Sequence, residues 1–163
     1  MSVQLKSKTM DNIWDFALAI YQQNGVKADC LVAQDVYGLD VTMLIFALYR
    51  SRHGLGFDAP ASYELARQLT RMLVDPLRAR RRALKSTPAG HDPRTIAQLR
   101  DQIEAAELAG EHTILQTLIK SDIKGPKRNG YDSLCACVVA ANISLDLDLE
   151  ALLKRLALAG QKI

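Results

Sequence analysis

Apolar side chains recur at helical spacing along the first part of the chain. One stripe runs from Ile13 to Tyr21 and predicts a helix that Asp11 caps and Gly25 ends. A second helix is predicted from Val26 to about Tyr37. Residues 41–49 are apolar at every position except Thr42, after an Asp40 in the N-cap position. Because a helix that is apolar all round must be buried all round, we expect residues 41–53 to form the central helix.

The second half of the chain predicts longer helices. One spans about 61–85, with a kink or a break at Pro76, and the linker 86–92 follows it. Asp92 and Pro93 open a helix that ends near Ser121. A basic loop, 124–130, precedes two further helices over about 131–142 and 146–159. The pattern predicts an all-α, single-domain bundle of six or seven helices, with residues 1–10 frayed.

The composition fits a helical bundle and also predicts where in the cell the protein is located. The 163 residues are 48% hydrophobic and 6% aromatic, which is typical of a helical globular protein. Three cysteines without metal-finger spacing predict free thiols in the cytoplasm. No apolar run approaches the roughly 20 residues of a membrane span, and residues 1–12 carry no signal core, so we expect no membrane partner.

Basic residues are concentrated in the middle of the chain, although the net charge is only +3. Residues 50–100 hold eleven Lys and Arg against four Asp and Glu. If the helix continued past Pro76, a sector of roughly 60° would carry a stripe of five cations. These are Arg67, Arg71, Arg78, Arg82 and Lys85. Such a stripe is most often a solvated face with internal salt bridges, but it can also meet an acidic protein or a phosphate backbone.

A polar group near the second helix offers another site. Asp29, Cys30, Gln34, Asp35 and Asp40 cluster along this helix and its exit. The simpler interpretation makes Asp40 an N-cap, with Gln34 and Asp35 satisfying backbone groups at the junction. Alternatively, these five residues line a polar pocket beside the central helix, around Gln34 and Asp35, where Asp35 could act as an acid or base or bind a cation.

The acidic residues Glu104, Glu107 and Glu111 predict a structural role. They lack the Glu and His spacing of a di-iron helix, since Glu111 and His112 are adjacent, and we expect neither a metal nor a cofactor. If the chain turns about residue 89, the two long helices form an antiparallel hairpin. That register sets Arg71 opposite Glu107 and sets Arg67 opposite Glu111, as partly buried ion pairs.

A set of residues between Trp14 and Glu111 carries a resemblance to a known family. The set is Trp14-Asp-Phe-Ala, Tyr21, Val26, Cys30-Leu31, Gln34-Asp35, Gly38, Asp40-Val41, Pro76-Leu-Arg78, Arg81-Arg82, Leu84-Lys85, Glu107-Leu108 and Glu111. Over roughly residues 14–120 the chain resembles a small proteobacterial family of uncharacterised helical proteins. The resemblance implies a bacterial, cytoplasmic helical protein without a known activity, and it leaves the helical pair 124–163 unmatched.

Two functional hypotheses follow. The first is a non-catalytic interaction or regulatory protein that uses the basic helix surface of about 67–85, because no catalytic motif is present. An unidentified protein partner is favoured over nucleic acid, since no aromatic residue interleaves the arginines. The second is a small-molecule-binding protein or enzyme whose arginines hold an anionic ligand. The candidate binding residues are Gln34, Asp35, Arg78, Arg81, Arg82 and Lys85.

Overall fold

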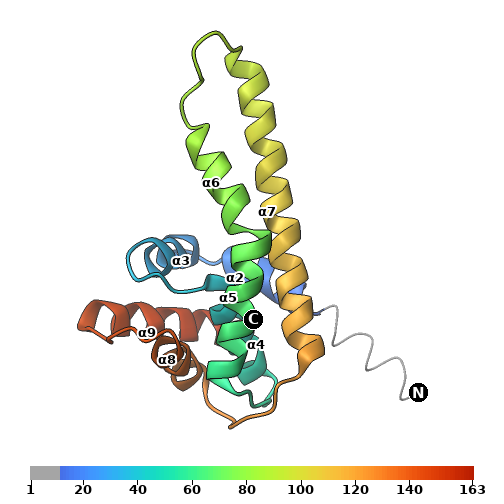
Figure 1. Cartoon of the computed structure of the whole chain (residues 1–163). Helices are drawn as coiled ribbons and strands as arrows, with labels where there is room; N and C mark the ends of the chain where they lie inside the picture. Colours follow the sequence, from blue (N-terminus) through green and yellow to red (C-terminus); the bar gives the residue numbers. More distant parts are fainter. Residues whose placement is uncertain (1–11) are drawn as a thin grey trace.

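The computed structural model describes residues 12–163, and this part of the chain is helical without a β-strand. The predictions that residues 1–10 are frayed and that Asp11 caps a helix lie outside the described residues. Figure 1 shows the helices of the described part in sequence colours. They are α2 (Asn12–Tyr21), α3 (Val26–Asp35), α4 (Val41–Arg52), α5 (Ala59–Leu73), α6 (Asp75–Ala83), α7 (Pro93–Ser121), α8 (Gly130–Ala140) and α9 (Leu147–Gln161).

Helix α4 lies at the centre of the bundle. All residues from 42 to 50 are buried, and Phe46 is only 1% exposed. The helix packs against α2, α3, α5, α7, α8 and α9, so it has neighbours on every side. The apolar pattern of residues 41–49, which only Thr42 interrupts, therefore predicted the central helix correctly.

Aspartates begin three of these helices as the sequence suggested. The side chains of Asp40, Asp92 and Asp146 accept hydrogen bonds from backbone N–H groups in the first turns of α4, α7 and α9. Such caps satisfy donors that have no partner within the helix. Each of these helices consequently starts within one residue of its predicted position.

The predicted helix 61–85 is broken, as Pro76 indicated. Helix α5 ends at Leu73 and α6 begins at Asp75, with Pro76 in the first turn of α6 and Val74 between the two helices. The break separates two helices where the pattern alone suggests one. It raises the count from the expected six or seven to eight in the described part of the chain.

Helices α6 and α7 lie side by side and rise together from the bundle (Figure 1). They form the predicted antiparallel hairpin. No residue from 75 to 113 belongs to the main hydrophobic core cluster, although Val74 and Ile114 do. The hairpin is therefore an arm held by its own contacts beyond the core.

The register predicted for this hairpin is wrong. Glu107 pairs with Arg81 rather than Arg71, and Glu111 pairs with Arg78 rather than Arg67. Arg81 is close to the end of α6, whereas Glu107 lies about four turns into α7. The linker 84–92 therefore runs in extended form alongside the first turns of α7 (Figure 1). It reverses direction only at Pro88–His91, where Gly90 has a φ of 80°. A symmetric turn about residue 89 overlooked this extended path.

The C-terminal helices complete the core around α4. Helix α8 packs on α4 and α5, and α9 packs on α3, α4 and α8. Five leucines of these two helices are at most 2% exposed: Leu134, Leu149, Leu152, Leu153 and Leu156. None of the helices in the described residues is long and apolar enough to cross a membrane.

Candidate functional site

A polar network lies where the α5–α6 break meets α7. Gly110 of α7 faces this break, and a Cβ on it would be 3.0 Å from the Val74 side chain and 3.2 Å from the Leu73 carbonyl oxygen. The glycine thus permits a close approach of the two backbones. Because Glu107 and Glu111 flank Gly110 on the same helix, the approach brings both carboxylates to the arginines of α6.

Glu107 is the most deeply buried acid of α7. Glu107 is 5% exposed. The Arg81 guanidinium donates two hydrogen bonds to its carboxylate, from Nε to Oε1 at 2.6 Å and from Nη2 to Oε2 at 3.2 Å. Glu107 in turn raises the pKa of Arg81, chiefly through this hydrogen bonding. A two-point contact to a buried carboxylate fixes the rotation of α6 against α7.

Arg78 bridges a carboxylate of its own helix and one on α7, a turn further along α7 than Glu107. Its Nη1 lies 3.0 Å from Asp75 Oδ1, and its Nη2 lies 3.6 Å from Glu111 Oε1. Burial raises the pKa of Glu111, and Glu107 and Asp40 add to this effect, while Arg78 opposes it. Arg78 therefore compensates only part of the cost of a carboxylate in this position.

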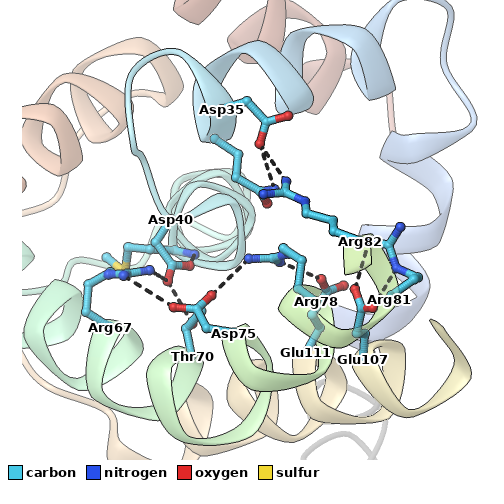
Figure 2. A network of polar contacts seen from close by, with 12 residues as sticks. Asp35, Asp40, Arg67, Thr70, Asp75, Arg78, Arg81, Arg82, Glu107 and Glu111 are labelled. Carbon is cyan, nitrogen blue, oxygen red and sulfur yellow. Dashed lines mark hydrogen bonds and ion pairs between the residues drawn. The ribbon is translucent and has the colours of Figure 1, made fainter. Parts of the chain in front are cut away.

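Asp40 has a structural role beyond its N-cap. Its Oδ2 accepts a hydrogen bond from Thr70 Oγ1 at 2.7 Å and lies 3.4 Å from Arg67 Nη1, while its Oδ1 caps α4. Arg67 also lies 3.6 Å from Asp75, so the Asp75 carboxylate joins Arg67 and Arg78 (Figure 2). The predicted N-cap is confirmed, and the same carboxylate ties α4 to α5.

Asp35 faces the arginines from the opposite side, at the end of α3. Its Oδ1 lies 2.9 Å from Arg82 Nη2 and accepts a longer hydrogen bond from Gln34 at 3.3 Å. These two donors, Gln34 first, hold the pKa of Asp35 below its ordinary value. The expectation that Gln34 and Asp35 satisfy backbone groups is therefore wrong, because both side chains are engaged with other side chains.

Between α3 and the α5–α6 segment is an open polar cleft of about 620 Å³. Figure 2 shows Asp35 on one side of this space and Arg67, Arg78 and Arg82 on the other. Four cationic side chains line it against two carboxylates. The lining residues are Gln34, Asp35, Gly38, Leu39, Arg67, Asp75, Arg78, Ala79, Arg82 and Lys85.

Most of the predicted binding residues meet in this cleft. Gln34, Asp35, Arg78, Arg82 and Lys85 line it together, whereas Arg81 turns away to Glu107. Sequence reasoning missed Arg67 and Asp75 as lining residues. Only the break at Val74 brings Arg67 of α5 next to Asp75 of α6, and this contact has no signature in the spacing of residues.

The part of the chain that forms the cleft also matches a known protein family. A family model described as "protein of unknown function" (DUF2390) matches residues 12–118. The chain belongs to this family. All the residues that line the cleft lie inside the match, and α8 and α9 lie outside it. The resemblance to an uncharacterised family over roughly 14–120 is thus confirmed. No match was found among curated proteins or among solved structures.

Proposed function

We propose that this DUF2390 chain is a non-catalytic binding protein that holds a small anionic ligand in the cleft between α3 and α6. The observation that carries the proposal is the lining of a space of about 620 Å³ by four cations against two carboxylates, of which Arg82 and Lys85 have no buried carboxylate as partner. This volume falls in the range of small-molecule sites. Clustered guanidinium groups favour phosphate and carboxylate groups, which they can bind with two parallel hydrogen bonds.

The arrangement of the arginines favours this cleft over a flat basic surface along residues 67–85. Arg67 and Arg78 of the predicted stripe lie within 4 Å of carboxylates of the protein, and Arg81 beside the stripe pairs with Glu107. Charges that are satisfied inside the protein contribute little to a docking surface. A single concave site therefore accounts for the basic segment better than an extended interface does.

Two cations of the cleft are the best anchors for a ligand. Arg82 lies in the last turn of α6, and the Lys85 backbone N–H donates to the Arg82 carbonyl oxygen at 3.2 Å. Both side chains line the cleft, and Lys85 is exposed. Among the described residues, no carboxylate lies within 4 Å of the Lys85 ammonium group. Lys85 can thus meet a ligand without giving up a partner.

The lining supports binding rather than catalysis. It contains no serine, cysteine or histidine among the described residues, and each of its two carboxylates is held by an arginine. A nucleophile or an unengaged base would be needed for acid–base or covalent chemistry.

Free thiols at Cys30, Cys135 and Cys137 support a cytoplasmic location for this binding protein.

Calorimetric titration with inorganic pyrophosphate at low salt tests the proposal. The wild-type chain is expected to bind, and the double variant Arg82→Ala, Lys85→Ala to bind at least about tenfold more weakly, because charge-assisted hydrogen bonds are lost. Arg80→Ala is the matched control, since Arg80 is an exposed cation of α6 that does not line the cleft. An equal loss in the control, or no binding by the wild type, would contradict the proposal.

A further inference from the structure

The ion pair between Asp35 and Arg82 spans the cleft and differs from the other pairs of the network. Its two side chains are each 48% exposed, whereas Arg81 and Glu107 are 26% and 7% exposed. The pair joins the last turn of α3 to the last turn of α6 across open solvent (Figure 2). It therefore occupies an anchor of the proposed ligand with a carboxylate of the protein itself.

We infer that Asp35 is a built-in competitor for the ligand, which takes Arg82 from Asp35 when it binds. This inference rests on the proposed function and adds how that site is controlled. The Asp35 carboxylate supplies the same chemistry as a carboxylate or phosphate group of a ligand. Without a ligand, Arg82 is paired with the Asp35 carboxylate of the protein itself. Ligand binding breaks this link between α3 and α6.

The exchange leaves neither Arg82 nor Asp35 without a favourable interaction. An exposed ion pair contributes little net free energy, because water solvates each charge when the pair separates. Arg82 keeps an anionic partner when a ligand replaces Asp35. Asp35 keeps its hydrogen bond from Gln34 and enters water without a desolvation cost.

The inner pairs cannot exchange in this way. Glu107 is 5% exposed, so a ligand that took Arg81 would leave a buried carboxylate without a partner. Arg78 is shared between Asp75 and Glu111, and a ligand that took it would leave Glu111 without its ion pair and Asp75 with Arg67 alone. Arg82 is accordingly the arginine whose partner a ligand displaces.

The variant Asp35→Asn tests the inference by removing the competing charge. Its affinity for inorganic pyrophosphate should rise about two- to fivefold over the wild type, the range that a surface pair supports. Asp29→Asn is the matched control. Asp29 is on the same helix and pairs with Arg155 at 2.8 Å, but it does not line the cleft. The control should bind like the wild type, and thermal unfolding should show that both variants are folded.

A double variant separates displacement from a general change of charge. In an Arg82→Ala background, Asp35→Asn should give no gain in affinity, because no shared arginine remains to release. An undiminished gain there, or no gain in the single variant, overturns the inference while wild-type binding leaves the proposed function intact. If neither the wild type nor Asp35→Asn binds pyrophosphate, the proposed function and this inference both fail.

Discussion

At the scale of the residue, the charged groups of this protein divide into structural and exchangeable ones by burial. Glu107 and Asp40 are 5% and 4% exposed and are surrounded by donors from other helices. Asp35 and Arg82 meet at the surface. Separating a buried ion pair costs much free energy, whereas separating a solvent-exposed pair costs little because water solvates both charges. The charged groups around the cleft therefore combine buried inner pairs with an exposed outer pair, for which we propose a change of partner.

Truncation of Glu107 tests the structural part. Glu107→Ala should lower the free energy of unfolding by about 2 kcal/mol or more, since it removes a buried carboxylate and leaves Arg81 without its two-point contact. Glu64→Ala is the control, because Glu64 is exposed and, within residues 12–163, accepts a side-chain hydrogen bond only from Gln68 on its own helix. That change should cost less than about 0.5 kcal/mol. Equal losses in urea denaturation would show that the Glu107 pair contributes no more than a surface pair.

The sequence predicted which acids are buried but not which arginines bind them. Glu107 and Glu111 lie at the margin of the apolar side of α7, and this pattern alone indicates that a neighbouring helix covers them. Partner choice depends on the path of residues 84–92 and on the break at Val74. Both are set by three-dimensional packing, so the helical spacing that identified the acids could not assign Arg78 and Arg81 to them.

At the scale of the element, local signals carried most of the prediction of the fold. Asp40, Asp92 and Pro76 mark helix boundaries because capping and proline geometry act within one turn. The apolar run 41–49 identified α4 because it leaves no polar face. The crossing of loops, in contrast, has no periodic signature, and the contact between the loops around Gly56 and Gly125 emerges only from the structure.

Two glycines allow these loops to cross. A Cβ on Gly125 would lie closer than 3.0 Å to three backbone atoms of Phe57 and Asp58, and a Cβ on Gly56 would meet the backbone of Gly125 and Pro126. The Asp58 N–H donates to the Ile123 carbonyl oxygen across this crossing at 3.3 Å. The loops join α4 to α5 and α7 to α8, so the crossing positions four helices.

Substitution of Gly125 should therefore be destabilising. Gly125→Ala is expected to cost roughly 1–3 kcal/mol or more in urea unfolding, because a backbone segment must move rather than a flexible side chain. Gly130→Ala is the control in the same region, since its nearest neighbours would be 3.6 Å away, an ordinary contact. The control should be neutral or slightly stabilising. A Gly125 variant as stable as the control would show that the crossing can relax.

At the scale of the whole molecule, the core extends beyond the part of the chain that forms the cleft. The cleft lies entirely within the family match, 12–118, but the central helix α4 depends on helices beyond it. Helix α8 packs along α4, and α9 contacts α3, the helix that carries Gln34 and Asp35. The C-terminal pair thus holds one side of the cleft in place without contributing a lining residue.

Deletion of residues 124–163 should abolish folding. Each of the five leucines that α8 and α9 bury contributes roughly 2 kcal/mol, so their loss is on the order of 10 kcal/mol, comparable to the whole stability of a typical domain. The single tryptophan, Trp14, stacks on His112 at a centroid distance of 4.6 Å and reports on packing in the retained part. The truncated chain should lose cooperative urea unfolding in both tryptophan fluorescence and far-ultraviolet circular dichroism, with the full chain as the control. A cooperative transition at the full chain's midpoint would instead mean that residues 12–118 fold independently and that α8 and α9 only cover them.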